Sequence, residues 1–388
     1  MSYLKLQDEI VLEFNVDSGF YKVYNNDLLP FALRDGILDT TKNEVSYRQI
    51  QQNYSLLMDF FANRTLSVKR ENAKAILNSL HIAQTNDYTT KLKIIFLCKG
   101  LSITDDYWVT NNKEEKWADV NLRKNKLSEV LSYVALSGKT LTITGDIRIP
   151  ELTAQGAYAK AWVRYNNNLF LLKASSKGGR EAEVEVNVSK SVDHTNVPHV
   201  EYRLMDYKNM TVSACHSLTN NSRSIVPAYE VEAWCNRNNK NFIEFCKEID
   251  KENFMKMQIV DYLLSNSDRH SGNWGFFVDN QTGKLLGIHD LFDHNNSFDE
   301  HELNDINGGD SLIFTGKTKK EIAKYAMRNC HFVIEPIKKI DEYFINDMQK
   351  KSFLEKANEL GLDIYKNKKH MHNKKIYKNK ENDKELEL

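Results

Sequence analysis

Hydrophobic and polar residues alternate along the first part of the chain and then give way to helical spacing. Residues 9–24 alternate around an Asp-Ser-Gly turn, which predicts two strands joined tightly. Residues 46–64 and 68–82 place apolar side chains every three or four positions, as amphipathic helices do. The apolar segment 91–103 is dense enough to predict a buried strand. We therefore expect a separate mixed α/β accessory domain over residues 1–146.

A β-rich segment follows, from residue 141 to residue 174. Its apolar stretches are separated by glycine-containing turns and by a run of three asparagines after Tyr165. Such a run between two strand-like segments is typical of a hairpin. We expect a β-rich lobe over residues 147–218.

The spacing after Val226 is mainly helical. It continues to Gly361, a glycine at the position of a helix C-cap. This pattern predicts a helical lobe over residues 219–365. Residues 366–388 are rich in lysine and poor in apolar side chains, which predicts a disordered tail.

Composition narrows the class of protein. The 388 residues include 53 Lys plus Arg and 53 Asp plus Glu, so no net field draws the chain onto nucleic acid or anionic lipid. The five cysteines form no C-x-x-C pair, as expected of reduced thiols in a cytosol. No segment has the apolar length of a membrane span, and the first residues do not resemble an export signal. We expect a cytoplasmic protein with no membrane association and no direct nucleic-acid binding.

The strongest chemical signal is SDRHSGNWGFF, which follows the apolar run IVDYLL and precedes a predicted hairpin. Phosphoryl transfer requires a carboxylate beside the acceptor hydroxyl and an oxygen ligand for Mg²⁺ nearby. Asp268 supplies a carboxylate, and Asn273 supplies a carboxamide five positions later, the separation used by protein kinases. His270 lies between them. Each residue alone would be explained by turn capping or packing, but the combination indicates a nucleotide site.

A second metal ligand is expected at the far end of the hairpin, in GIHDLFDHNNSF. Asp290 and Asp293 both qualify chemically, since Mg²⁺ prefers oxygen ligands. One carboxylate there would bind the metal between the β- and γ-phosphates of ATP. Gly272 and Gly275 would let the backbone approach a phosphate closely.

These motifs resemble the HipA-like kinases, bacterial serine/threonine kinases whose catalytic loop is similar to that of phosphoinositide kinases. The resemblance is strongest in LLSNSDRHSGNWGF and IHDLFDHNNS and extends over about residues 147–362. It implies an α+β, bilobal protein-kinase-like fold, with residues 147–218 as the N-lobe and residues 219–365 as the C-lobe. It also implies Asp268 as the catalytic base, Asn273 and Asp293 as Mg²⁺ ligands, and His270 as a residue that orders the loop.

The family's phosphate-binding stretch is similar to TAQGAYAKAW, which places Gly156, Ala157 and Lys160 in register. Tyr158 stands where the family has glutamine, so the side-chain contacts of that loop differ. The resemblance places Thr153 at the position of a serine that is autophosphorylated in the family. We therefore expect Thr153 to be a phosphorylation site.

The resemblance also implies a lysine that binds the α- and β-phosphates, and Lys173 in LFLLKAS is the candidate. Its partner would be a glutamate on the next helix; Glu181, Glu183 and Glu185 are available, and Glu185 fits the family pattern best. The sequence EVEVNV alternates like a strand, whereas the family requires a helix, which we favour. The inter-lobe hinge, with backbone groups that bind adenine, is expected at Ser213, Ala214 and Cys215.

The predicted function is an ATP- and Mg²⁺-dependent kinase that phosphorylates Ser or Thr hydroxyls of a protein. The resemblance implies an antitoxin or other regulatory partner as well. Two alternatives stay open, since a catalytic loop does not specify the acceptor. One is a kinase of a small-molecule or lipid hydroxyl, and the other is a nucleotide-binding scaffold without catalysis.

Overall fold

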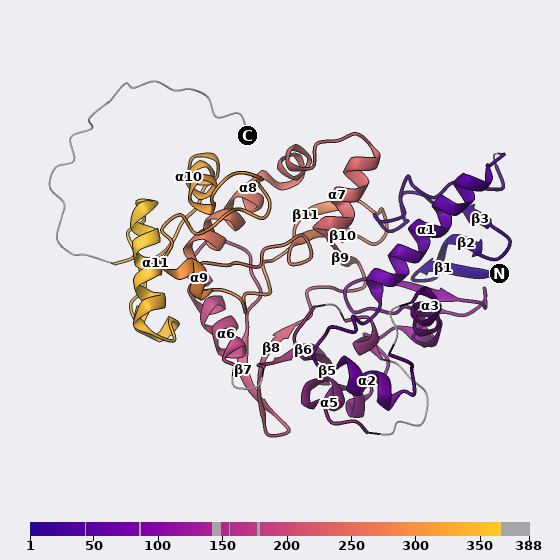
Figure 1. Ribbon diagram of the computed structural model, residues 1–388, viewed down its shortest axis with the longest axis horizontal. Helices are drawn as coiled ribbons and strands as arrows, with labels where there is room; N and C mark the ends of the chain where they lie inside the picture. Colours follow the sequence, from indigo (N-terminus) through magenta and orange to yellow (C-terminus); the bar gives the residue numbers. More distant parts are fainter. Residues whose placement is uncertain (43, 85–86, 142–148, 155, 177–178, 366–388) are drawn as a thin grey trace.

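The computed structural model describes the chain except residues 43, 85–86, 142–148, 155, 177–178 and 366–388 (Figure 1). The predicted lysine-rich tail, most of the strand expected just after residue 141 and the proposed boundary at residues 146–147 fall outside the described residues. The described part has an α+β fold in which antiparallel sheets pack against helices, and this confirms the predicted fold class. The bounds of the elements follow region by region.

The N-terminal region contains a four-stranded antiparallel sheet in the order β3-β2-β1-β4. Helix α1 packs against it with Leu57 and Phe61, which meet Leu12 and Phe14 of the sheet in one apolar core. The capping box of Ser46 and Gln49 begins this helix. The elements are β1 (Ser2–Leu6), β2 (Glu9–Asn15), β3 (Phe20–Val23), α1 (Tyr47–Arg64), α3 (Tyr88–Leu97), β4 (Tyr107–Thr110) and α4 (Trp117–Val120).

The strand predicted at residues 91–103 is wrong, because most of this segment belongs to helix α3. The Asp87 side chain caps the helix by accepting a hydrogen bond from the backbone of Thr90. Ile94 and Ile95 are its buried positions, and Cys98, the C-cap residue that follows Ile94 by four positions, is buried as well. A dense apolar run does not by itself distinguish a buried strand from a buried helix. Here the feature that marks a helix is the N-cap at Asp87.

A second four-stranded antiparallel sheet, in the order β5-β6-β8-β7, forms the β-rich lobe. Asn166 and Asn167 have positive φ in the predicted β5–β6 hairpin. Helices α2 and α5 share an apolar core with this sheet, so residues 73–79 and 129–137 pack directly on the β-rich lobe (Figure 1). The elements are α2 (Ala73–Ser79), α5 (Glu129–Ser137), η1 (Pro150–Leu152), β5 (Lys160–Tyr165), β6 (Asn168–Ala174), α6 (Glu181–Val192), β7 (Arg203–Tyr207) and β8 (Met210–His216).

The segment EVEVNV is helical, as the family resemblance required, and lies in α6. Val186, Val188 and Glu185 are all buried, because the helix is enclosed both by the sheet and by the helical lobe. The valines therefore alternate in sequence without marking a strand. Tertiary burial outweighs the small helix penalty of valine.

The helical lobe is built around α8, which has a kink at Asp250. A three-stranded sheet, β11-β10-β9, lies beside it and includes the predicted hairpin after the SDRHSGNWGFF loop. Gly361, just past the last helix, has φ +69° as expected of a C-terminal glycine. The elements are β9 (Arg223–Pro227), α7 (Ala228–Arg237), α8 (Phe242–Leu263), β10 (Gly275–Asp279), β11 (Leu285–Ile288), α9 (Glu300–Leu303), α10 (Lys319–Asn329), η2 (Ile340–Tyr343) and α11 (Asp347–Glu359).

The cysteines and the apolar helices bear on two further expectations from the sequence. All five cysteines are free thiols, and four of them are buried. Within the described ranges, no helix combines the length and the apolar character that crossing a bilayer requires.

Candidate active site

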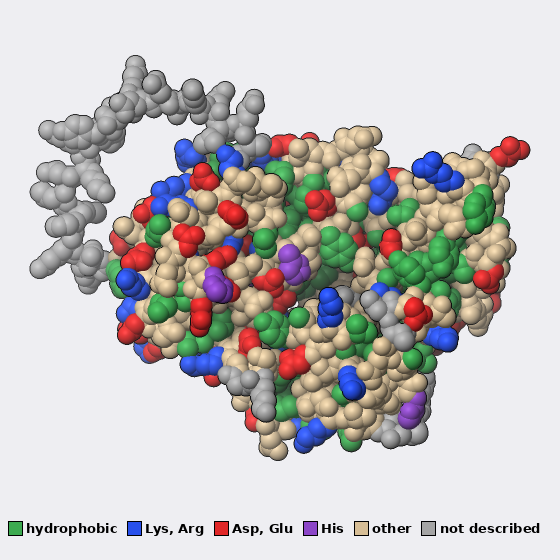
Figure 2. Space-filling model, in the orientation of Figure 1, with side chains coloured by type: hydrophobic (Ala, Val, Ile, Leu, Met, Phe, Trp, Pro, Cys, Tyr) green, Lys and Arg blue, Asp and Glu red, His purple; other side chains and the backbone are tan. Residues whose placement is uncertain are grey.

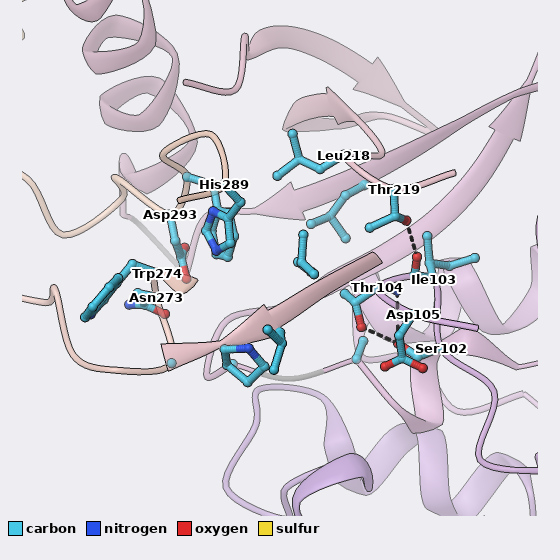
Figure 3. Close-up of a pocket in the computed structure, with 18 of the residues that line it drawn as sticks. Ser102, Ile103, Thr104, Asp105, Leu218, Thr219, Asn273, Trp274, His289 and Asp293 are labelled. Carbon is cyan, nitrogen blue, oxygen red and sulfur yellow. Dashed lines mark hydrogen bonds between the residues drawn. The ribbon is translucent and has the colours of Figure 1, made fainter. Parts of the chain in front are cut away.

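A cavity of about 810 Å³ lies between the β-rich lobe and the helical lobe, where the surface in Figure 2 is hollowed. The N-terminal region also contributes to its wall, through residues 102–105 (Figure 3). Most of the site residues predicted from sequence line this one space. They are Thr153, Gly156, Ala157, Lys160, Lys173, Cys215, Asp268, His270, Asn273 and Asp293.

Lys173 of β6 lies at the centre of a buried charge cluster. Its Nζ is 2.5 Å from Oε1 of Glu185 on α6 and 2.9 Å from Oδ1 of Asp293. Burial alone would lower the pKa of Lys173, but the carboxylates of Asp293 and Glu185 hold it well above its ordinary value. Lys173 therefore presents a fixed positive charge at the cavity wall.

Asp293 carries the complementary charge. Burial would raise the pKa of Asp293, but the ammonium groups of Lys173 and Lys160 hold it far below its ordinary value. The residue has φ +60°, a conformation uncommon for a non-glycine residue. Its neighbour Asp290, which is equally suitable by sequence, does not line the cavity, and burial raises the pKa of its carboxyl.

The structure does not support Ser213 and Ala214 as the adenine-binding hinge. Both lie inside β8 and pair with β6 on one side and β7 on the other. The Ser213 hydroxyl donates to Oε2 of Glu185 at 2.6 Å, so it orients the partner of Lys173. The strand runs on to His216, and the cavity is lined by Cys215 and by residues 216–219. Residues 217–219 follow this strand and line the cavity, and they were not predicted because the end of a strand is not marked in the sequence.

The loop after α8 is held by Arg269, which sequence reasoning missed. Its guanidinium binds both carboxylate oxygens of Asp261 on α8, at 3.0–3.1 Å. Its Nη1 donates to the carbonyls of Asn273 at 2.7 Å and Phe292 at 2.9 Å. Arg269 therefore ties the catalytic loop to the segment that carries Asp293. The only signal in the sequence was an arginine directly after Asp268, within a run of polar residues.

Asn273 is oriented by Asp268. Its Nδ2 donates to the backbone carbonyl of Asp268 at 2.8 Å and to Oδ2 of the same residue at 3.1 Å. The amide oxygen of Asn273 is thus the atom left for a metal. His270 is exposed; its Nδ1 accepts from the backbone of Gly272 at 3.0 Å, and its Nε2 lies 3.7 Å from Oδ1 of Asp268. These contacts order the loop.

Two side-chain hydrogen bonds through Asn296 link Asp268 to the phosphate-binding stretch. Nδ2 of Asn296 donates to Oδ2 of Asp268 at 2.9 Å, and Oδ1 of Asn296 accepts from the Tyr158 hydroxyl at 2.8 Å. Tyr158, at the position where the family has glutamine, therefore reaches the catalytic loop. Asn296 was not singled out from the sequence, although it follows Asp293 by only three residues.

Gly156 has φ +101°, and a Cβ there would collide with Nζ of Lys160. Lys160 is buried. Burial and the nearby charge of Lys173 lower its pKa to about 8, although the carboxylate of Asp293 acts in the opposite direction.

Thr153, the predicted phosphorylation site, is also buried, and its hydroxyl donates to the carbonyls of Leu101 at 2.5 Å and Pro150 at 3.2 Å. Phosphorylation of Thr153 would require this segment to move outward.

The donor set fits a magnesium ion held together with phosphates. Asn273 and Asp293 lie at the same end of the pocket in Figure 3 and offer one amide oxygen and one ionised carboxylate. Among the described residues, no three His, Cys, Asp or Glu side chains form a metal-binding group. Mg²⁺ usually takes one or two protein ligands and completes its shell with phosphate and water.

Comparisons with known proteins confirm the resemblance to HipA-like kinases. The chain is 27% identical to the serine/threonine-protein kinase CtkA of Helicobacter pylori over 135 residues, which cover 29% of this chain and 42% of CtkA. The chain thus spans less than half the length of this curated relative. No family model matches.

Two solved structures are similar in fold. The crystal structure of a proinflammatory kinase CtkA of Helicobacter pylori has a TM-score of 0.36 and 19% identity, covering 52% of this chain and 89% of that chain. HipA of Shewanella oneidensis, in a toxin–antitoxin complex with HipB and operator DNA, has a TM-score of 0.49 and 11% identity, covering 93% of this chain and 96% of that chain.

Proposed function

We propose that this relative of the HipA-like kinases transfers the γ-phosphate of ATP to Ser or Thr hydroxyls of a protein, with Mg²⁺ as cofactor. The observation that supports this proposal most directly is the cluster of Lys173, Glu185 and Asp293. It lies in the wall of the same cavity as Asp268 and Asn273. Phosphoryl transfer depends mainly on positioning and on neutralising charge, and this set supplies both.

Each residue has a distinct task in this proposal. Residues 217–219 and the floor formed by β9 and β10 enclose the adenine, and Gly156 and Ala157 admit the phosphates to the loop before β5. Lys160 and Lys173 bind phosphate oxygens as point charges. Asn273 and Asp293 would hold Mg²⁺, which would shield the charge that develops between the β- and γ-phosphates.

Asp268 is the general base of the proposed reaction. The acceptor hydroxyl gives its proton to the Asp268 carboxylate while its oxygen bonds to the γ-phosphorus, and the bond from that phosphorus to the bridging oxygen of ADP breaks. The proton ends on Asp268 and the electron pair on ADP. Asn273 and Asn296 keep the carboxylate oriented for this step.

The proposal is tested by incubating total cell lysate with ATP and Mg²⁺ and either the wild-type protein or Asp268→Ala. Phosphosites read by mass spectrometry should include Ser or Thr sites on proteins that appear only with the wild type. If the same phosphosites appear with both proteins, the kinase assignment is wrong. If no protein site appears and the wild type nevertheless binds ATP, the chain is a scaffold or acts on a small molecule or lipid.

A regulatory partner of the antitoxin kind is part of the proposal and is supported by the family resemblance alone. Affinity purification of the full chain from its own cells should bring down one protein in constant ratio, and adding that protein should lower phosphate transfer. A co-purified protein that leaves transfer unchanged would argue against a neutralising role.

Replacing Asn296 by alanine is expected to lower the turnover of phosphate transfer by up to about 100-fold, because small displacements of a catalytic group have effects of this size. The KM for ATP should change little, since Asn296 supports the base rather than the nucleotide. Tyr158→Phe removes only the outer hydrogen bond and should have a smaller effect. Asn304→Ala, at an exposed position of the same lobe, is the control. Unchanged turnover in Asn296→Ala would refute this positioning role.

A further inference from the structure

The cavity extends beyond the nucleotide site into a second region, here called the N-terminal arm. This arm lies where α1 and β4 of the N-terminal region meet the start of α7 in the helical lobe. No role of the predicted site residues accounts for it. Its walls are formed by Phe60, Arg64, Asp105, Tyr107, Tyr229 and Glu230.

The N-terminal arm is directly connected to the catalytic loop. The backbone N–H of Tyr229 donates to the carbonyl of Ser271 at 3.1 Å, and that of Ala228 donates to the carbonyl of Trp274 at 3.0 Å. Residues 270–272 line the same cavity. The arm therefore begins beside the loop that presents Asp268, where an acceptor hydroxyl must arrive.

Arg64 does not make this arm a phosphate site. Its guanidinium forms a bidentate pair with Asp105, at 2.7 Å and 3.0 Å. Nη2 also donates to the carbonyls of Gly100 at 2.7 Å and Tyr107 at 3.3 Å. Its charge is compensated and its hydrogen-bond donors are engaged within the N-terminal region, so the pair contributes no net charge to the arm.

Glu230 is different, because the contacts of the described residues give it no cationic partner within ion-pair distance. Its carboxylate accepts one hydrogen bond, to Oε2 from the backbone N–H of Ala32 at 3.3 Å. Burial raises the pKa of Glu230 to about 7, and Arg64, the Ala32 hydrogen bond and Arg237 oppose this shift only in part. A carboxyl group in this setting would be stabilised as the anion by a nearby cation.

The aromatic side chains complete the arm. Tyr229 lies next to Glu230 in the chain, and its hydroxyl has no hydrogen-bond partner among the described contacts. Tyr107 of β4 also lines the cavity, with its hydroxyl already donated to the carbonyl of Leu28 at 2.8 Å. One carboxylate without a cation, flanked by aromatic rings, matches an ammonium or guanidinium group in charge and shape.

We propose that the N-terminal arm binds a lysine or arginine side chain of the protein acceptor, with Glu230 as the anion that pairs with it. This inference rests on the proposed kinase function and names the substrate class: a Ser or Thr with a basic residue close by in the chain. The N-terminal region then acts in substrate selection, because it forms one wall of the subsite that reads the neighbour of the phosphorylated residue.

The test uses synthetic peptides with one serine, in which a single arginine or a matching glutamine is moved through the flanking positions. The full-length wild type should prefer arginine at one position by about tenfold or more in kcat/KM, the size of one charge-assisted hydrogen bond. Glu230→Gln keeps the shape and the acceptor for Ala32 but should lose that preference. Glu232→Gln, on the same helix but outside the cavity lining, should retain it.

Peptide binding separates this inference from the kinase assignment. Binding of the fluorescent arginine and glutamine peptides is measured in Asp268→Asn, with and without Glu230→Gln, where no transfer is needed. Tighter binding of the arginine peptide that depends on Glu230 supports the subsite even if no peptide is phosphorylated. Transfer without any preference for arginine, or a preference that survives in Glu230→Gln, overturns the inference and leaves the kinase function standing.

Discussion

Replacing Asp268 by asparagine is expected to lower the rate of phosphate transfer by about 100- to 10,000-fold, the usual contribution of a general base. Nucleotide binding should stay close to that of the wild type. The reason lies in the contacts of this carboxylate: Oδ2 accepts from Asn273 and Asn296, and an asparagine amide oxygen can take the same place. The substitution thus removes the proton acceptor and keeps the loop.

The measurement is transfer from labelled ATP under single-turnover conditions, with ATP affinity determined in parallel. Asp310→Asn is a matched control, because Asp310 is an exposed carboxylate of the same lobe outside the cavity lining. A variant Asp268→Asn with wild-type transfer would exclude Asp268 as the base. A variant that no longer binds ATP would show that the residue holds the site together instead.

The catalytic loop could be predicted from the sequence because its residues are close in number. Asp268, His270 and Asn273 lie within six positions, so the chain itself keeps them close together. Lys173 and Asp293 are 120 residues apart, and spacing alone does not place them together. The resemblance to known kinases, rather than any local rule, identified that pair.

Other features depend on tertiary contacts that leave little trace in the sequence. Arg269 is an ordinary arginine until its partners on α8 and before Asp293 are known. The helix α3 was predicted as a strand because both kinds of buried segment are apolar. Ser213 and Ala214 were predicted to face the nucleotide because nothing in the sequence of β8 marks where its pairing with β7 ends, at Ala214.

The choice between Asp290 and Asp293 shows the same limit. Both are carboxylates after the same hairpin, and the sequence gives no chemical reason to prefer one. The structure separates them: Asp293 lies in the cavity with its charge fixed by Lys173, whereas Asp290 does not line it. Because of this difference, a substitution of Asp290 is a matched control for the same substitution of Asp293.

Asp293→Asn is expected to abolish the effect of Mg²⁺ on nucleotide binding and to lower phosphate transfer on the order of 100-fold or more, since one preorganised charge at a transition state is worth about that much. In the absence of Mg²⁺, Asp293→Asn is expected not to weaken ATP binding. Lys173 is paired with Asp293 at 2.9 Å. Neutralising Asp293 frees the ammonium group for phosphate, so ATP should bind at least as tightly as to the wild type.

The measurement is ATP affinity of the wild type, Asp293→Asn and Asp290→Asn, each with excess Mg²⁺ and with EDTA. Asp290→Asn should behave as the wild type in both conditions, because its carboxyl lies outside the cavity. Thermal unfolding accompanies each titration, since Lys173 keeps Glu185 as a partner in Asp293→Asn and the fold should persist. If the effect of Mg²⁺ on ATP affinity survives in Asp293→Asn and disappears in Asp290→Asn, the metal ligand is Asp290 instead of Asp293. The phosphates would then be oriented differently relative to Lys173.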